Sequence, residues 1–157
     1  MTQQVQTSQA KVGVGLEVLW RALTKELRFV AQKVIPNLVK DVELIEGDGG
    51  LGSVLLFKFH DGVSAMTYQK EKIVELDESL HQITLEVMEG GYISLGFASY
   101  KTTLILTATG EQESLVDVIV SYHHSQTDQE SAIPSNSVDS TLHFIKCLES
   151  YFLNGAS

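Results

Sequence analysis

The stretch V-D-S-T-L-H-F-I-K-C-L-E-S-Y-F, residues 138–152, decides the fold. Its apolar residues recur at three- and four-residue steps, the spacing of one face of an α-helix, and a second row lies beside the first. The two rows are Val138, Leu142, Ile145, Leu148 and Phe152, and Thr141, Phe144, Leu148 and Tyr151. Because the apolar arc is unusually wide, this helix needs cover on more than one side. Gly155 predicts its end.

The residues before this helix supply the cover as β-strands. From Val39 to Tyr122 the apolar residues follow a period of two, with turn residues about every ten positions, which is typical of an antiparallel meander of about six strands. The clearest stretch, His81 to Val87, predicts one buried and one wet face. The buried set is His81, Ile83, Leu85 and Val87, the wet set is Gln82, Thr84 and Glu86, and a later buried set is Val116, Val118, Val120 and Tyr122.

The N-terminal part adds one strand and two helices. Gln3 to Val12 alternates loosely and predicts a strand, and the helical spacing that follows persists to Pro36 with a break near Thr24. That spacing is carried by Leu16, Leu19, Trp20, Leu23 and Leu27. The order predicts an α+β fold in which a seven-stranded curved antiparallel sheet wraps around the long C-terminal helix. We expect residues 1–157 to form a single domain, and a sheet curved this far can leave an internal cavity.

Composition excludes several classes of partner. The 157 residues include 11 Lys and Arg against 20 Asp and Glu, a formal charge of −9, which argues against nucleic acid as a partner. No apolar run approaches the ~18 residues that span a bilayer, and the start Met1 to Lys11 is polar, so we expect a cytoplasmic protein without membrane contact. Cys147 is the only cysteine and is expected to be a small buried hydrophobe.

A glycine-rich stretch, I-E-G-D-G-G-L-G-S at Ile45 to Ser53, has the spacing of a dinucleotide-binding motif. In that motif the last glycine opens a helix whose amides hold a pyrophosphate. Here Val54 to Phe57 continue as a strand instead. The stretch therefore predicts a turn between two strands and no nucleotide cofactor.

The stretch Y-Q-K-E-K-I-V-E-L, Tyr68 to Leu76, indicates a binding site. If Lys70 and Lys72 face water, Gln69 and Glu71 face inward, because strand side chains alternate. An inward carboxylate is costly unless hydrogen bonds are donated to it, and a ligand with N–H or O–H groups would do so. The alternative is a solvated strand near a sheet edge, and the sequence leaves it open.

Catalytic and metal motifs are not found in the sequence. The five histidines, His60, His81, His123, His124 and His143, show no metal-ligand spacing with cysteine or carboxylate partners. No G-x-S-x-G or comparable nucleophile motif is present. We therefore expect no metal site, no cofactor and no catalytic residue.

Several motifs together resemble a known family. E-G-D-G-G-L-G at Glu46 to Gly52, Y-Q-x-E at Tyr68 to Glu71 and M-E-G-G-Y at Met88 to Tyr92 resemble the plant pathogenesis-related class ten proteins, the major birch pollen allergen family. Three further stretches look most similar to its phytohormone-binding branch, the cytokinin-specific binding proteins. They are Leu38 to Val42, Tyr100 to Thr103, and S-T-L with L-E-x-Y within Ser140 to Tyr151.

This resemblance implies the helix-grip fold and a cavity that accepts cytokinins, gibberellins or related plant compounds. Its polar anchors would lie on the fourth strand and the last helix. Carried over, the ligand-binding residues are Gln69, Glu71, Thr141, Leu23, Phe144 and Leu148. The branch commonly has tyrosine where this chain has Phe144, so one hydroxyl able to bond the ligand is missing.

The same resemblance includes an enzymatic branch, the norcoclaurine synthases, which use a lysine, a tyrosine and an acid in this cavity. The lysine position falls at Ile83 and the tyrosine position at Gln69, while the acid remains as Glu71. Without the lysine amine we expect no proton shuttle for iminium-type chemistry.

The sequence thus predicts binding of a small plant hormone in a hydrophobic cavity, without catalysis and with a role in plant defence. The alternatives are a norcoclaurine-synthase-like enzyme and a general carrier of flavonoids or alkaloids. A storage or interaction protein with a collapsed interior is a further reading.

Overall fold

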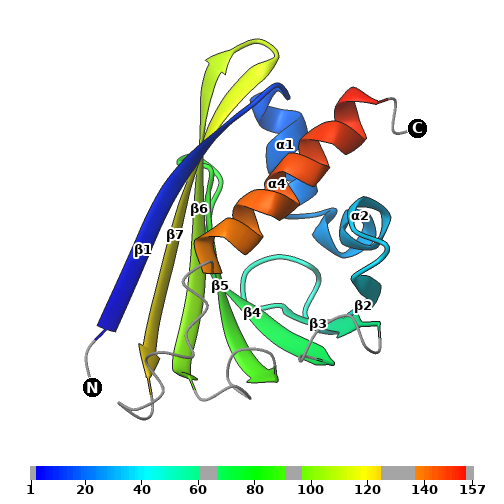
Figure 1. Ribbon diagram of the computed structural model, residues 1–157, viewed down its shortest axis with the longest axis vertical. Coiled ribbons are helices and arrows are strands. Elements are labelled where there is room, and N and C mark those ends of the chain that lie inside the picture. Colours follow the sequence, from blue (N-terminus) through cyan, green and yellow to red (C-terminus); the bar gives the residue numbers. More distant parts are fainter. Residues whose placement is uncertain (1–2, 61–66, 91–96, 125–136, 155–157) are drawn as a thin grey trace.

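The computed structural model describes residues 3–60, 67–90, 97–124 and 137–154. One antiparallel sheet of seven strands has the order β1-β7-β6-β5-β4-β3-β2, and it curves around helix α4 (Figure 1). The strands are β1 Gln3–Val12, β2 Val39–Glu46, β3 Val54–Phe59, β4 Tyr68–Asp77, β5 Gln82–Gly90, β6 Phe97–Gly110 and β7 Glu113–His124. The helices are α1 Leu16–Leu23, α2 Leu27–Val34 and α4 Ser137–Leu153. The predicted fold class is confirmed.

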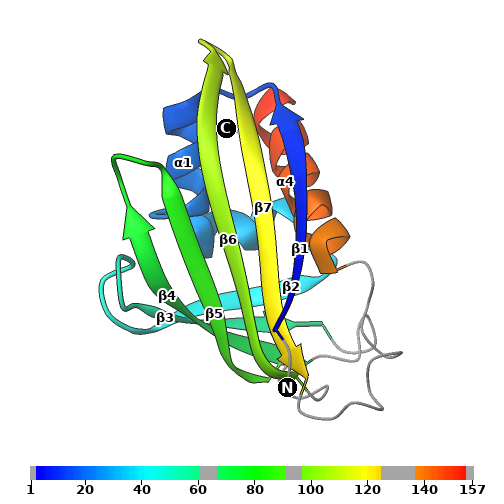
Figure 2. The ribbon, with the colours of Figure 1, turned by 90° about the vertical axis from the view of Figure 1, so that its left-hand side faces the viewer.

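The sheet bends strongly between its two edges. Strands β1, β7 and β6 run along the length of the molecule, whereas β2 and β3 run across their direction (Figure 2). Helix α4 lies on the concave face, against β1 and β7, and α2 contacts both α4 and β2. The bend separates β3 and β4 from α4 and leaves space between them.

Strand β4 contains two irregularities that shape its inner face. The register with β5 shifts between Lys70 and Glu71 and again between Ile73 and Glu75. A β-bulge bends the strand and re-aims the side chains beside it. The second shift allows both Ile73, which is fully buried, and Leu76, which packs against the core, to face inward.

The break between the two short helices is confirmed at Thr24. Its hydroxyl donates to the Trp20 carbonyl over 2.7 Å, and its backbone N–H bonds to Arg21 and not to Trp20, so α1 ends there. The side chain is buried, and α2 starts three residues later at Leu27. The two helices therefore form a bent pair at one side of the core.

The glycine-rich stretch is a turn between β2 and β3, as predicted. Gly47, Gly49 and Gly52 have φ values of 89°, 101° and 84°, which only glycine adopts without strain. A Cβ at Gly47 would lie 2.4 Å from the Ser53 hydroxyl. These glycines therefore serve the turn, and no helix begins at Gly52.

Three predictions about single residues are wrong. His81 lies in the turn before β5 with φ 53°, not on the strand's buried face, because the chain must reverse there. Thr84 is 2% exposed although it lies on the outer face, because its hydroxyl bonds to Glu75 (2.7 Å) and Thr103 (2.8 Å). Cys147 is only partly buried.

The other predicted buried residues of the sheet are confirmed. Ile83, Leu85, Val87, Val116, Val118, Val120 and Tyr122 are each at most 6% exposed. No helix in the described ranges is long and apolar enough to cross a membrane. Gly155 and Pro134, which bracket the predicted last helix, and Gly91 and Tyr92 of the M-E-G-G-Y motif lie outside the described residues.

Candidate functional site

A cavity of about 220 Å³ lies between the concave face of the sheet, α2 and the start of α4. Its walls are mostly apolar, and its polar groups come from β4, β6 and α4. The lining residues from the three helices and from the residue that follows α2 are Leu23, Leu27, Ala31, Ile35, Ser140, Thr141 and Phe144. Those from the strands are Val39, Phe57, Phe59, Gln69, Glu71, Leu85, Tyr100, Thr102 and Leu104. An apolar cavity with a few convergent polar groups is the usual form of a small-molecule site.

Gln69 and Glu71 form the polar centre of the cavity. Both point inward from β4, which is the first of the two alternatives that the sequence left open, and Gln69 Nε2 donates to Glu71 Oε2 over 3.1 Å. The other amide atom, Gln69 Oε1, is buried without a hydrogen-bond partner among the described residues. A buried polar atom without a partner is costly, and a ligand donor would satisfy it.

Burial changes the acidity of Glu71. Loss of water raises the pKa of Glu71 from 4.5 to about 7, and the hydrogen bond from Gln69 lowers it only in part. Near neutral pH the carboxyl group is therefore present in both protonation states. A group with such a pKa can both donate and accept a proton at the working pH, as acid–base catalysts do.

The remaining predicted residues fall into two groups. Leu23, Thr141 and Phe144 line the same cavity as Gln69 and Glu71. Leu148 does not line it, because it lies one turn further along α4 and is fully buried in the core. Five of the six predicted residues are thus brought together, and their role toward a ligand stays a prediction.

Sequence reasoning missed polar groups on β6 and α4. Tyr100, Thr102 and Ser140 also line the cavity. Tyr100 is 4% exposed and its ring stacks on Tyr122, with centroids 6.1 Å apart. The alternation of Tyr100, Thr102 and Leu104 predicts that they share one face of β6. Only the curvature of the sheet brings that face opposite β4.

Ile83, at the position that the resemblance gives to a lysine, is fully buried. It pairs with Leu76 on β4 and Leu104 on β6 and does not line the cavity. No lysine, arginine or histidine is among the described residues that line the cavity. Among these described lining residues, Glu71 is thus the only carboxyl group, and Tyr100 is the other titratable residue.

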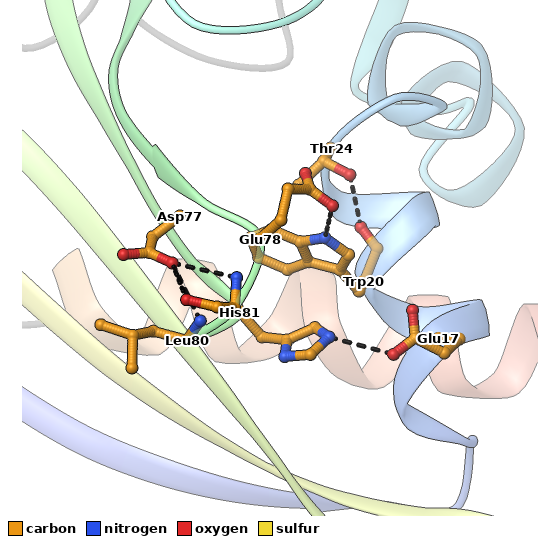
Figure 3. A network of polar contacts seen from close by, with 8 residues as sticks. Glu17, Trp20, Thr24, Asp77, Glu78, Leu80 and His81 are labelled. Atoms are coloured by element: carbon orange, nitrogen blue, oxygen red, sulfur yellow. Dashed lines mark hydrogen bonds and ion pairs between the residues drawn. The ribbon is translucent and has the colours of Figure 1, made fainter.

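A polar network outside the cavity fixes α1, which carries Leu23 (Figure 3). Trp20 Nε1 donates to Glu78 (3.1 Å), and His81 Nε2 lies 3.0 Å from Glu17. The rings of His81 and Trp20 pack edge to face, with their centroids 5.3 Å apart. These contacts join α1 to the turn between β4 and β5, so the cavity wall from α1 is anchored to the strand that carries Glu71.

A separate open groove runs along the other side of α4. His143 and Cys147 lie one helical turn apart there, with Nε2 and Sγ at 3.5 Å. The sequence reading overlooked this spacing between a histidine and the cysteine. No group of three or more metal-binding side chains occurs in the described part of the chain.

Residues 8–155 match the Pathogenesis-related protein Bet v 1 family. The chain belongs to this family. The family resemblance seen in the sequence is therefore confirmed, whereas its phytohormone-binding branch is not identified by the relatives.

Two curated relatives are enzymes by name. Norbelladine synthase from Narcissus pseudonarcissus is 30% identical over 125 residues, which cover 79% of this chain and 75% of that protein. S-norcoclaurine synthase from Thalictrum flavum subsp. glaucum is 31% identical over 104 residues, 66% of this chain. The aligned part is 47% of the synthase, about half its length.

A solved structure of norcoclaurine synthase from Thalictrum flavum, in complex with dopamine and hydroxybenzaldehyde, has the same fold. The TM-score is 0.83 at 22% identity, and the match covers 99% of this chain and 90% of that one. The cited neighbour therefore holds two small molecules within this fold.

The prediction that the chain is not an enzyme is overturned by the two synthases among its relatives. That prediction rested on the missing lysine and tyrosine. The acidity of Glu71 was not predicted. Burial raises the pKa of Glu71 to about 7, and this burial depends on the folded cavity and not on the sequence around one residue.

Proposed function

We propose that the chain acts as a single ligand-binding domain whose cavity joins a primary arylethylamine to an aromatic aldehyde, with Glu71 as the acid–base group. The observation that carries the proposal is a titratable carboxyl group, with a pKa of about 7, in the polar centre of an apolar cavity. The synthase relatives and the dopamine and hydroxybenzaldehyde held by the same fold support this pair of substrates.

The proposed step uses Glu71 in its protonated form. The neutral amine nitrogen attacks the aldehyde carbon, and one of its protons passes to the aldehyde oxygen, which gives a neutral carbinolamine. The C–O bond of the carbinolamine then breaks. Glu71 donates its proton to the departing hydroxyl, which leaves as water. The products are an iminium cation and the Glu71 carboxylate, so charge and atoms balance and the new cation lies beside the new anion.

The apolar walls assist this step by excluding water. Phe57, Phe59 and Phe144 line the cavity and offer flat surfaces against which aromatic rings can pack. The enclosed site also strengthens the attraction between the iminium and Glu71. The missing lysine leaves Glu71 as the only carboxyl or amine group of the described lining that can move the proton.

The test is incubation of the purified chain with dopamine and hydroxybenzaldehyde and detection of the condensed product by mass spectrometry. Glu71→Gln keeps the shape and removes the proton donor, and we expect a rate at least ~100-fold lower. The rate ratio of the unmodified chain to Glu71→Gln should fall as the pH rises above about 7, because the acid form is lost.

A matched control is Glu86→Gln on the neighbouring strand. Glu86 lies opposite Lys72 and Lys101 in the register and does not line the cavity. This variant should retain the rate of the unmodified chain. A protein-dependent rate that Glu71→Gln leaves unchanged, or no product above the uncatalysed reaction, would refute the proposed step.

Reversible binding of a plant hormone is a second candidate function. One observation favours it: Gln69 Oε1 and the Glu71 carboxylate provide two neighbouring acceptors for the N–H groups of a cytokinin. Calorimetric titration with a cytokinin and a gibberellin is the test. Saturable heat that is weakened in Glu71→Gln supports this candidate, and no heat with either hormone contradicts it.

A further inference from the structure

The cavity isolates one acidic side chain from compensating charge. The described residues that line the cavity around Glu71 contribute hydrocarbon, amide and hydroxyl groups, and Tyr100 is the other titratable group among them. Lys70 and Lys72 flank Glu71 on β4 but alternate to the outer face, where Lys70 pairs with Glu89. Any positive charge that neutralises Glu71 inside the cavity must therefore come with the ligand or as a proton.

The donors available to Glu71 are also few. Gln69 Nε2 is the one described side chain that donates to it, at 3.1 Å. The neighbouring Gln69 Oε1 can only accept a hydrogen bond, and it has no partner within the part of the chain that the structure describes. With Glu71 ionised, the pair offers acceptors on both side chains, which suits an N–H-rich ligand. With Glu71 protonated, the pair offers one O–H donor, which suits a ligand carbonyl.

We infer that ligand binding in this cavity is coupled to the proton on Glu71, and that the coupling has opposite signs for two classes of ligand. An ammonium ligand binds the carboxylate and expels the proton. A neutral carbonyl ligand binds the carboxylic acid and takes up a proton. The inference deepens the proposed function, since it concerns the same cavity and the two substrate classes named there.

The physical reason is that an uncompensated charge in a low-dielectric cavity is unfavourable. An ammonium group pairs with the carboxylate and also meets the faces of Phe57, Phe59, Tyr100 or Phe144, which attract cations. A carbonyl oxygen beside an ionised Glu71 would place two acceptors together, so the protonated form is the one that binds it. The raised pKa of Glu71 puts both forms within reach of neutral pH.

This coupling has a kinetic consequence for the proposed condensation. A charged amine that binds first holds Glu71 ionised and so withdraws the proton that the aldehyde needs. We therefore expect the amine to inhibit at high concentration, and the aldehyde to relieve that inhibition.

The test is calorimetric binding of two unreactive ligands, 2-phenylethylamine and 4-hydroxyacetophenone, to the unmodified chain at pH 6 and pH 8. Each titration is made in phosphate and in imidazole, which both buffer between pH 6 and pH 8 and whose different heats of ionisation report the protons exchanged. The amine should release close to one proton at pH 6 and bind roughly tenfold more tightly at pH 8. The ketone should bind roughly tenfold more weakly at pH 8 than at pH 6.

Two variants assign the proton to its residue. Glu71→Gln should abolish both proton exchange and pH dependence, whereas Glu86→Gln should leave both unchanged. Binding of the amine with the same affinity at both pH values and no proton release would overturn the inference, as would absence of binding by both ligands. The unmodified chain alone decides these outcomes, so the inference stays testable if a variant folds poorly.

The result is distinct from the failure of the proposed function. If dopamine and hydroxybenzaldehyde give no product while the two test ligands still exchange protons with opposite signs, the condensation is refuted and the coupling stands. If product forms without any proton exchange on binding, the coupling is refuted and the condensation stands.

Discussion

Two regions of the core lie along the same helix and differ in how completely they are filled. The packed region consists of Val12, Val116, Val118, Val120, Ile145 and Leu148, all with no exposed surface. The hollow region consists of Phe57, Gln69, Glu71, Thr141 and Phe144, which line the cavity. Helix α4 contributes to both, with Thr141 and Phe144 to the hollow region and Ile145 and Leu148 to the packed region.

The difference follows from the curvature of the sheet. Strands β1 and β7 run along α4 (Figure 2), and the small β-branched side chains of these two strands that belong to the packed region are fully buried there. Where β3 and β4 turn away, even phenylalanines do not close the gap. The comparison teaches that stability and ligand binding are assigned to adjacent residues of one helix, and single substitutions can separate them.

The largest effect should come from Ile145→Ala. Ile145 is fully buried in the packed region, so the variant loses hydrophobic burial and leaves a cavity, at a cost of about 4 kcal/mol in the free energy of unfolding. Phe144→Ala, one residue earlier, should cost about 2 kcal/mol despite the larger side chain, because Phe144 is only partly buried and already borders empty space. Urea denaturation measures both.

The order of the two effects is the decisive result. A larger loss of stability in Phe144→Ala than in Ile145→Ala would show that the hollow region contributes more to the free energy of unfolding than the packed region, contrary to the comparison. The m-value, which is the slope of the free energy of unfolding against urea concentration, should be the same in both variants. The change then reflects stability and not a different denatured state.

The next effect concerns the charge in the hollow region. The pKa of Glu71 is about 7 in the folded chain and ordinarily 4.5, so the folded chain binds more protons between these values and stability falls as the pH rises through them. The loss is complete above pH 7 and amounts to at most about 3 kcal/mol. Glu71→Gln should therefore unfold at a higher temperature than the unmodified chain at pH 8.

At pH 4 the same two proteins should have nearly equal stability, since Glu71 is protonated in both the folded and unfolded states. Thermal unfolding followed by circular dichroism at pH 4, 6 and 8 gives the comparison. Glu86→Gln, outside the cavity, is the control and should show no such divergence. Equal melting temperatures at pH 8 would mean that the cavity hydrates Glu71 and that its acidity is ordinary.

The architecture could be predicted from the sequence because the apolar residues recur at three- and four-residue steps in each helix and at two-residue steps in each strand. The α4 stretch and the alternating strands predicted the helix and the sheet, whereas the inward orientation of Gln69 and Glu71 was one of two alternatives that the sequence left open. The left-handed conformation of His81 and the burial of Thr84 were missed, because a turn and a cross-strand hydroxyl network depend on neighbours that are distant in sequence.

The site was predicted less completely for the same reason. Strand alternation could not show that β6 lies opposite β4, so Tyr100 and Thr102 were left out. The helical spacing of Leu148 resembles that of Thr141 and Phe144, yet Leu148 lies one turn too far along α4 to reach the cavity. The acidity of Glu71 depends on desolvation by the whole fold, which no local pattern records.

The smallest effects should come from removing one hydroxyl in each part of the core. Tyr122 is 4% exposed and does not line the cavity, and its hydroxyl accepts a hydrogen bond from Gln6 Nε2 at 3.1 Å. Tyr122→Phe should lower the free energy of unfolding by about 1 kcal/mol and leave ligand affinity unchanged. Thr141→Val, in the hollow region, should change stability by less than about 0.5 kcal/mol and weaken a ligand that bonds to the hydroxyl several-fold.

Tyr122→Phe should change stability and not affinity, and Thr141→Val should change affinity and not stability, because the two hydroxyls face different partners. Chemical denaturation and calorimetric titration with 2-phenylethylamine and 4-hydroxyacetophenone are made on the same preparations. The contrary outcome is that Thr141→Val lowers stability as much as Tyr122→Phe and still binds both ligands normally. In that outcome Thr141 belongs to the packed region and not to the hollow region.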